Sequence, residues 1–266
     1  PKCKGKAKRE TDTMDTFVNS SWYFFRYTDP DNNKEIFNKE NVKYWCPIDT
    51  YIGGAEHACM HLIYARFYTK FLADLGIIKF REPIKRLFHQ GMINDEKGQK
   101  MSKSKGNVVE PLEMIEKYGA DTLRYFIVSM ASPDKGFNWS IKGIQGSSRF
   151  IKKIASYFKK PKDEKDSPEV LAKLNKTIKE LKENYENIEY RKATIKLREL
   201  FDTIEKNSAS YETLSKFLIL LSPICPHITE EFYERLGNKK LIATAEWPKS
   251  DESKIKAKNT NANLNK

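Results

Sequence analysis

The chain has little cysteine and no long apolar run, and each of these features argues against a class of protein. Its four cysteines, Cys3, Cys46, Cys59 and Cys225, are scattered through 266 residues and form no closely spaced pairs, which argues against a disulfide-stapled secreted domain. No apolar stretch approaches the roughly 20 residues that span a bilayer, and no secretory signal is evident at the start. We therefore expect a reducing, cytoplasmic location.

Acidic residues are outnumbered by basic ones, 36 to 48, which gives a net charge of +12. Hydrophobic residues make up 39% of the chain and aromatic residues 12%, a balance that favours a buried core over disorder. The length suits one large domain or two ordinary ones. The positive charge permits a polyanionic partner such as a nucleic acid, although solvated lysine-rich helices produce the same balance.

A short lysine-rich segment offers the clearest sign of chemistry. In residues 100–106 three lysines alternate with a methionine and two serines, and Gly98 and Gly106 bound the segment. Glycines suit a loop with unusual backbone angles or a close approach to a ligand. Ammonium groups and hydroxyls suit a polyphosphate, above all where negative charge moves onto a leaving pyrophosphate. A solvated basic loop has the same composition, so the residue types alone leave both interpretations open.

A strand, a glycine pair and a helix are predicted in succession after residue 43. Tyr44–Ile52 has the pattern of a short buried strand, and Gly53 and Gly54 follow it. A helix is expected to open at Ala55–His57, because apolar residues recur at helical spacing beyond it. This order of elements places ligands at the carboxyl edge of a sheet, where Glu56 would accept hydrogen bonds from ribose hydroxyls. A tight turn without a ligand is the alternative explanation of the glycine pair.

Three further features involve aromatic residues, histidines and a cysteine. Phe17, Ser20 and Tyr23 fall at intervals of three in an aromatic-rich segment, which suits either a core or a pocket wall. His57 and His61 stand one helical turn apart, but no third ligand is apparent, so we expect no metal site in this chain alone. Cys3 resembles the second half of a zinc knuckle and would bind Zn²⁺ only with ligands from elsewhere.

The remainder of the chain is predicted to be largely helical. Leu87–Ile93 has the pattern of a second strand, Pro111 begins a helix that Gly119 ends, and Ala120–Met130 forms the next helix. From about residue 142 apolar stripes predict a bundle of amphipathic helices. After residue 248 the chain is rich in lysine and asparagine, which predicts disorder.

Several strings, in one order along the chain, resemble the leucyl-tRNA synthetases among the class I aminoacyl-tRNA synthetases. They lie at residues 14–17, 20–23, 51–58, 90–92, 100–104, 118–124 and 222–228, and they include the Lys-Met-Ser-Lys-Ser loop and the Gly-Gly-x-Glu-His turn. The resemblance covers residues 1 to about 248. Isoleucyl- and valyl-type enzymes share the lysine loop, but a Gly-x-Asp turn would be expected in them.

The resemblance implies an α/β fold, the second half of a Rossmann-type catalytic domain, followed by an all-α helical bundle. The expected parts are a remnant of a zinc knuckle or linker at residues 1–12 and the catalytic segment with its KMSKS loop at 13–130. A tRNA-binding bundle of the anticodon-binding type would follow at 131–248, and a disordered basic tail at 249–266.

The resemblance also implies roles for individual residues. The leucine pocket, an apolar slot with polar groups at its rim, would be lined by Phe17, Ser20, Tyr23 and His57. The catalytic residues would be Lys100, Lys103 and His57. The ATP-binding residues, with Glu56 on the ribose and residues 91–93 beside the adenine, would be Gly53, Gly54, Glu56, Gly91, Met92, Ile93, Lys100, Met101, Ser102, Lys103 and Ser104.

The implied reaction joins ATP and leucine into leucyl-adenylate, with Mg²⁺ accompanying the ATP, and then transfers leucine to the 3′ end of tRNA(Leu). The first signature of the family, His-Ile-Gly-His, does not occur in this sequence, nor do the first half of the nucleotide fold, the editing domain and the C-terminal appendage. A complementary N-terminal half is therefore an expected partner. The alternatives are another aliphatic class I synthetase, of the Ile, Val or Met type, and a non-catalytic tRNA-binding module.

Overall fold

The computed structural model describes residues 5–9, 11–12, 17–159 and 165–255, so Cys3 lies outside the described residues. The chain forms two compact units, Pro1–Gln90 (unit 1) and Gly91–Lys266 (unit 2). The domain boundaries predicted at residues 12, 130 and 248 stay predictions.

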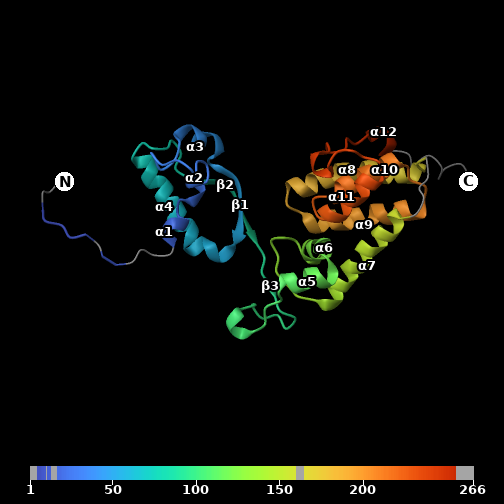
Figure 1. The fold of residues 1–266 in the computed structure, drawn as a ribbon, viewed down its shortest axis with the longest axis horizontal. Helices are drawn as coiled ribbons and strands as arrows, with labels where there is room; N and C mark the ends of the chain where they lie inside the picture. The colour runs from blue at the N-terminus through green and yellow to red at the C-terminus, as the bar shows by residue number, and fades with distance from the viewer. Residues whose placement is uncertain (1–4, 10, 13–16, 160–164, 256–266) are drawn as a thin grey trace, which may run out of the picture. The chain divides into compact units, whose positions relative to one another are not determined.

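Unit 1 is a small α/β unit (Figure 1). Its strands β1 and β2 are parallel, with Ile48 opposite Ile84 and Gly54 opposite Gln90, and α4 lies between them in the sequence. In chain order its elements are α1 (Phe17–Ser20), α2 (Tyr23–Arg26), α3 (Lys39–Trp45), β1 (Ile48–Gly54), the 3-10 helix η1 (Ala55–Cys59), α4 (His61–Asp74) and β2 (Ile84–Gln90).

The first strand begins later than the sequence predicts. Tyr44 and Trp45, expected in a strand, form the last turn of α3. The Asn38 side chain starts this helix by accepting hydrogen bonds from the backbone N–H groups of the first turn, which outweighs the strand preference of the aromatic pair. The helix ends just before Pro47, as expected for residues that precede a proline. The helix expected from Ala55 is also divided, into η1 and then α4.

Helix α4 has two apolar faces. Leu62, Ala65 and Leu72 are buried, and the last two belong to a core cluster that also contains Phe25 and Phe37. A second set of large apolar side chains is exposed at intervals of three or four residues along the same helix. This outer stripe consists of Met60, Ile63, Phe67, Phe71 and Leu75. Helix α4 therefore has more apolar surface than unit 1 covers.

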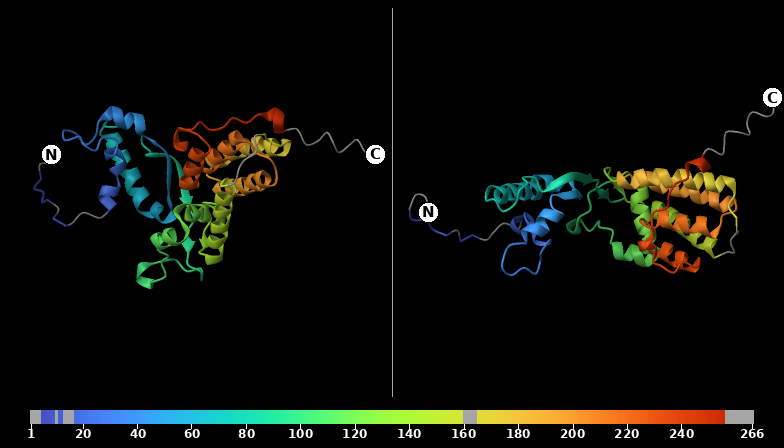
Figure 2. Two further views of the ribbon diagram at one scale, coloured as in Figure 1. Left: turned by 45° about the vertical axis from the view of Figure 1, so that its right-hand side comes forward. Right: turned by 90° about the horizontal axis from the view of Figure 1, so that it is seen from above.

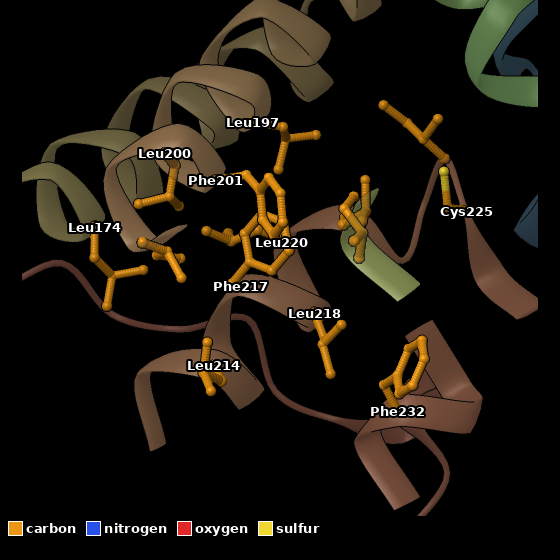
Figure 3. Packing of buried hydrophobic residues seen from close by; sticks show 14 of the residues in the cluster. Leu174, Leu197, Leu200, Phe201, Leu214, Phe217, Leu218, Leu220, Cys225 and Phe232 are labelled. Atoms are coloured by element: carbon orange, nitrogen blue, oxygen red, sulfur yellow. The ribbon is translucent and has the colours of Figure 1, made fainter. Parts of the chain in front are cut away.

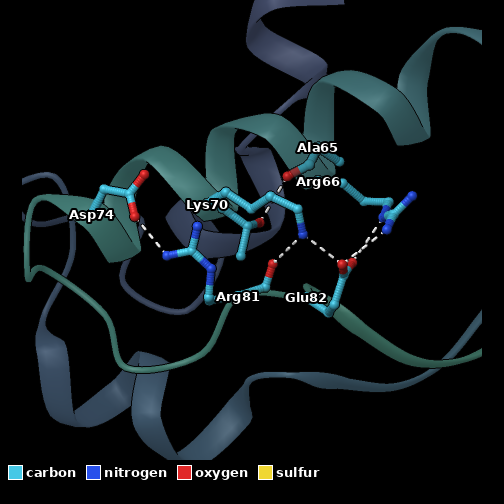
Figure 4. A network of polar contacts seen from close by, with 7 residues as sticks. Ala65, Arg66, Lys70, Asp74, Arg81 and Glu82 are labelled. Atoms are coloured by element: carbon cyan, nitrogen blue, oxygen red, sulfur yellow. Dashed lines mark hydrogen bonds and ion pairs between the residues drawn. The ribbon is translucent and has the colours of Figure 1, made fainter.

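A network of charged side chains joins α4 to the segment before β2 (Figure 4). Both Arg66 and Lys70 contact the carboxylate of Glu82, at 2.8 and 2.5 Å. The Lys70 ammonium also donates to the carbonyl oxygen of Arg81, and the Arg81 guanidinium reaches Asp74. Hydrogen bonds from Arg66 and then Lys70 lower the pKa of Glu82 from 4.5 to about 2. These side chains are half exposed, so solvent screens much of the attraction.

We predict that Glu82→Gln lowers the stability of unit 1 by about 0.5 kcal/mol at pH 7, since exposed ion pairs contribute little. The pKa of Glu82 is lower in the folded state, so its contribution is complete above pH 4.5 and is lost as the pH falls to about 2. The difference in stability between the variant and the parent chain should therefore vanish as the pH falls through that window. Urea unfolding, monitored by amide exchange in α4, measures this difference. Glu40→Gln, which removes a single exposed pair with Lys43, is the control. A difference that persists at pH 2 contradicts the prediction.

Unit 2 begins with short strands and ends in a helical bundle (Figures 1 and 2). Both helices expected around Gly119 are confirmed as α5 and α6, whereas the strand expected at Leu87–Ile93 is interrupted at Gly91 and Met92. The elements are β3 (Ile93–Asn94), η2 (Lys103–Lys105), α5 (Pro111–Tyr118), α6 (Ala120–Met130), β4 (Phe137–Asn138), α7 (Ile141–Phe158), α8 (Pro168–Glu186), α9 (Tyr190–Lys206), α10 (Tyr211–Leu221), α11 (Pro226–Arg235), η3 (Ile242–Thr244) and α12 (Glu252–Ile255).

The bundle is built around a core of leucine and phenylalanine (Figure 3). Serine hydroxyls start three of its helices by accepting from a backbone N–H in the first turn, at Ser140, Ser167 and Ser210. The core side chains are fully buried and recur at helical spacing on α9 and α10. The residues labelled in Figure 3 are Leu174, Leu197, Leu200, Phe201, Leu214, Phe217, Leu218, Leu220, Cys225 and Phe232.

Helix α6 is joined to the bundle by the side chains of Asp121 and Arg124. The carboxylate of Asp121, buried at 6% exposure, accepts from the backbone N–H groups of His227 and Ile228 and contacts Nδ1 of His227 at 2.8 Å. It thus caps the start of α11. The guanidinium of Arg124 donates to the carbonyls of Pro223 and Ile224, just after α10. Helix α6 is thereby held to residues 223–228, which lie about a hundred residues later in the chain.

The segment after residue 248 corrects one prediction. Ser250 and Asp251 hydrogen-bond to Asn175 of α8, and Glu252 begins α12 and contacts Lys179. The prediction of disorder from residue 249 is therefore wrong for 249–255, while 256–266 lie outside the described residues. Across the described part of the chain, no helix combines the length and the apolar character needed to cross a membrane.

We predict that Asp121→Ala destabilises unit 2 by about 2 kcal/mol, because it removes a helix cap and leaves partly buried N–H donors of α11 without their acceptor. Asp121→Asn retains one acceptor oxygen of nearly the same shape and should lose about half as much. Chemical denaturation followed by far-UV circular dichroism measures both. Equal losses in the two variants would show that the hydrogen bonds to α11 are not what Asp121 contributes.

Candidate functional site

The glycine pair lies at the carboxyl end of β1, as predicted. Gly53 pairs with His89 and Gly54 with Gln90 of β2, and η1 follows at once. A side chain built at Gly53 would meet no atom within 4 Å, so the backbone there is open. A Cβ at Gly54 would lie 2.4 Å from Oε2 of Glu56. The carboxylate of Glu56 therefore folds over Gly54, and a larger side chain at position 54 would displace this exposed carboxylate.

The residues predicted to form a leucine slot lie on three elements of unit 1. Ser20 is half buried on α1, Tyr23 begins α2, and His57 is exposed on η1. The side chain of Phe17 lies outside the described part of the structure. Of these, Tyr23 is connected to His57 through a third residue, because both lie near the ring of His61, with centroids 6.0 and 6.1 Å away.

Tyr51 and His61 lie beside Tyr23, although the sequence analysis assigned neither residue to the leucine slot. The hydroxyl of Tyr51 is 2.6 Å from the hydroxyl of Tyr23 and 2.7 Å from Nε2 of His61. The sequence showed His61 only as half of a weak metal pair with His57. The signal that could have revealed His61 is its place beside Leu62 and Ala65 in the helical pattern. All three side chains are buried at the start of α4.

Burial keeps both of these groups neutral. Desolvation, with a smaller repulsion from His57, lowers the pKa of His61 below 6.5, so the imidazole is uncharged at pH 7. Desolvation and then the hydrogen bond with Tyr23 raise the pKa of Tyr51 well above its ordinary value. The interior of this site therefore offers neutral hydrogen-bonding groups rather than charge.

In unit 2, the predicted site residues begin with a closely packed backbone segment. The N–H of Gly91 donates to the carbonyl of Pro133, and the carbonyl of Met92 accepts from Phe137. A Cβ at Gly91 would lie 2.1 Å from the backbone carbon of Lys135, so position 91 requires glycine. Ile93 continues this pairing opposite Phe137 in β4.

The lysine loop has a rigid base. Asp95 accepts from the backbone N–H groups of Lys97 and Gln99, and its other oxygen accepts from the side-chain amide of Asn107. Asn107 in turn accepts from the N–H of Ser102 and donates to the carbonyl of Lys100. The hydrogen bond from Asn107, followed by that from Gln99, lowers the pKa of Asp95. Both ends of the loop are thus tied to one carboxylate.

The ammonium and hydroxyl groups of the loop lie at the surface of unit 2. Lys100, Lys103 and Ser104 are exposed, and the hydroxyls of Ser102 and Ser104 are 2.7 Å apart. Met101 is half buried and packs against the cluster around Phe126. Gly106 ends the short helix η2 in the left-handed conformation, φ +65°, which favours glycine. A paired set of hydroxyls beside exposed ammonium groups suits phosphate oxygens.

Comparison with known proteins identifies the family to which this chain belongs. Residues 2–140 match the family described as tRNA synthetases class I (I, L, M and V), and residues 168–265 match the anticodon-binding domain of tRNA ligase. The chain therefore belongs to the class I tRNA synthetases. The fold class predicted from the sequence is confirmed.

Among its relatives are proteins named leucine–tRNA ligase. That of Thermosipho melanesiensis is 47% identical, over 96% of this chain and 34% of the relative. That of Petrotoga mobilis is 45% identical, over 97% of this chain and 34% of the relative. The chain thus spans about a third of the length of the curated relatives that it matches.

Two solved structures are similar. The agnB2 LeuRS of Agrobacterium radiobacter K84, in a ternary complex with tRNA and LeuAMS, has a TM-score of 0.85 at 33% identity, over 96% of this chain and 36% of that one. The methionyl-tRNA synthetase of Mycobacterium tuberculosis, in complex with methionyl-adenylate, has a TM-score of 0.60 at 18% identity, over 81% and 48%. The second likeness is one of fold alone.

The part of the chain that the structure describes contains no cluster of three or more His, Cys, Asp or Glu arranged to hold an ion. Zn²⁺ binding through Cys3 stays a prediction on a residue outside that part.

We predict that Asn107→Ala loosens the lysine loop without unfolding unit 2. Removing the acceptor of the Ser102 N–H should raise amide exchange at Ser102 about tenfold, which corresponds to the loss of one hydrogen bond. The amide of Gly119, which donates to the carbonyl of Ile115 at the end of α5, serves as an internal reference. Val108→Ala, the exposed neighbour, is the matched control. Unchanged exchange at Ser102 would show that Asn107 does not hold the loop.

Proposed function

We propose that this chain forms part of a leucine–tRNA ligase. The observation that carries the proposal is the lysine loop, which presents exposed ammonium groups and paired hydroxyls on a rigid base, in a chain 42–47% identical to leucine–tRNA ligases. The reaction is the activation of leucine by ATP to leucyl-adenylate, followed by transfer to the 3′ end of tRNA(Leu). A cytoplasmic location belongs to the same proposal.

The first step transfers the adenylyl group of ATP to leucine. An oxygen of the leucine carboxylate attacks the α-phosphorus, the bond to the bridging oxygen breaks, and pyrophosphate leaves with the negative charge. Lys100 and Lys103 stabilise that charge, and the hydroxyls of Ser102 and Ser104 donate to the phosphate oxygens. Mg²⁺ enters with ATP as part of the substrate. Because no covalent enzyme intermediate forms, orientation and charge stabilisation supply the rate.

The remaining groups position the two substrates. The carboxylate of Glu56, folded over Gly54, is placed to accept from the ribose hydroxyls, while the open backbone at Gly53 lets the nucleotide approach. Residues 91–93 present backbone to the adenine. Ser20, Tyr23, His57 and Phe17 line the leucine slot, and His57 also acts beside the reacting carboxylate. The helical bundle predicted at residues 131–248 binds the tRNA.

The second expected partner is the complementary N-terminal half of the catalytic domain. A parallel sheet is normally covered on both faces, yet Ile52 of β1 and Leu87 of β2 are 52% and 43% exposed. The outer stripe of α4, including Phe67 at 69% exposure, has the spacing with which one helix packs on another. These surfaces support a complementary segment that supplies the His-Ile-Gly-His signature.

We expect leucine-dependent exchange of pyrophosphate into ATP when the chain is mixed with such a segment, and little or none with the chain alone. In the active mixture Lys103→Ala should lower the exchange rate roughly 10²–10³-fold, the usual effect of removing one donor to a developing charge. Lys105→Ala, two residues further along the same short helix, is the control and should change the rate only slightly.

Other outcomes would replace the proposal. Exchange driven by isoleucine, valine or methionine in preference to leucine would indicate another aliphatic class I synthetase. Salt-sensitive tRNA binding without exchange under any condition would indicate a tRNA-binding module. Equal losses in the Lys103 and Lys105 variants would show that the loop contributes general positive charge rather than a specific contact.

A further inference from the structure

Unit 2 contains a cavity of about 560 Å³ that is lined by residues of α6, α8 and α9 and of two segments outside the helices. Three of its eight lining residues are aromatic: Tyr185 near the end of α8, Tyr190 at the start of α9 and Trp247 after η3. The others are Arg124 of α6 and four apolar residues. A cavity of this size with mostly apolar walls is typical of a small-molecule site. None of its residues is among those proposed to bind ATP or leucine.

The aromatic walls of the cavity are fixed in place. The hydroxyl of Tyr185 donates to the carbonyl of Leu220, which anchors the ring. The rings of Tyr190 and Trp247 lie beside it, with centroids 6.2 and 5.7 Å away. Trp247 is held in turn, because the segment that follows it hydrogen-bonds to Asn175 of α8. A flat aromatic ligand can therefore pack against preset rings at little cost in entropy.

The cavity also has hydrogen-bond donors that the protein does not use. The guanidinium of Arg124 has five N–H bonds, and two of them donate to the carbonyls of Pro223 and Ile224. Its charge meets no carboxylate in an ion pair among the described residues, since Asp121, one turn earlier, is bound to the start of α11. Nε1 of Trp247 is buried, and no acceptor for it lies in the described part of the chain. A positive charge and an unpaired donor both favour a ligand that supplies an anionic acceptor.

We propose that this cavity binds a small aromatic carboxylate. The aromatic ring packs among Tyr185, Tyr190 and Trp247, and the carboxylate accepts hydrogen bonds from the guanidinium of Arg124. A free amino acid, leucine included, is disfavoured, because no lining residue is acidic and its ammonium group would lose water without gaining a partner. An aliphatic acid pairs with Arg124 but makes weaker contact with the rings.

Titration of the whole chain with 2-naphthoate tests the proposal. The sequence has only four tryptophans, so ¹⁵N–¹H correlation spectra resolve their indole signals, and Trp247→Phe identifies that of Trp247. We expect 2-naphthoate to shift this signal in a saturable manner. The neutral 2-naphthamide should bind about tenfold more weakly, because a hydrogen bond between charged groups is the stronger one. Cyclohexanecarboxylate, which keeps the charge without a flat ring, should also bind about tenfold more weakly.

Two substitutions test the two halves of the recognition separately. Tyr190→Leu removes one of the three rings and should weaken the binding of 2-naphthoate about fivefold, whereas Tyr190→Phe keeps the ring and is the matched control. Arg124→Gln should weaken the binding of 2-naphthoate about tenfold and leave that of 2-naphthamide unchanged. Because Arg124 also binds the carbonyls after α10, circular dichroism checks its fold. The pair of Tyr190 variants tests the site even if Arg124→Gln does not fold.

Each contrary outcome has a definite meaning. Absence of a saturable shift of the Trp247 signal at millimolar 2-naphthoate overturns the proposal. Shifts confined to Trp139, in the cluster that includes Met101 of the lysine loop, would place the probe elsewhere and overturn it as well. Equal affinities for the acid and the amide, or equal losses in the two Tyr190 variants, would do the same. None of these measurements uses synthetase activity, so their result is independent of the proposed function.

Discussion

One buried carboxylate determines how unit 2 is assembled. Asp121 stands in the first turn of α6 and caps α11, which begins more than a hundred residues later. Arg124, one helical turn further on, binds the carbonyls that follow α10. The segment from β3 to α6 is thereby fixed to the bundle through hydrogen bonds as well as through apolar packing. The lysine loop and the helical bundle consequently share one compact unit.

The groups proposed to hold leucine in unit 1 and those proposed to hold phosphates in unit 2 differ in their electrostatics, and the difference matches what each group is proposed to hold. In unit 1 the buried groups are neutral and bonded to one another, as in Tyr23, Tyr51 and His61. In unit 2 the ammonium groups of Lys100 and Lys103 are exposed. An aliphatic side chain is best held where polar groups are already paired, whereas phosphates are best held by cations that remain available.

The sequence predicted features that depend on local signals. Pro111 and Gly119 mark the ends of α5, and apolar spacing identifies α6 to α11, so these elements were found. Tyr44 and Trp45 were misassigned because their strand preference is weaker than the cap that Asn38 provides. The ordered structure of residues 249–255 was not predicted, because it depends on hydrogen bonds to Asn175 in a distant helix. The hydrogen bonds that join Tyr23, Tyr51 and His61 have no local signal in the sequence, since the three residues meet only in the folded unit.

The double attachment of the lysine loop has a consequence for the entropy of ligand binding. A flexible loop must lose its conformational freedom when it closes on a ligand, and that loss weakens the affinity. Asp95 and Asn107 hold both ends of this loop by hydrogen bonds within the chain itself. Much of the ordering is therefore completed when unit 2 folds, and the entropy that remains to be lost on binding is largely that of the lysine side chains.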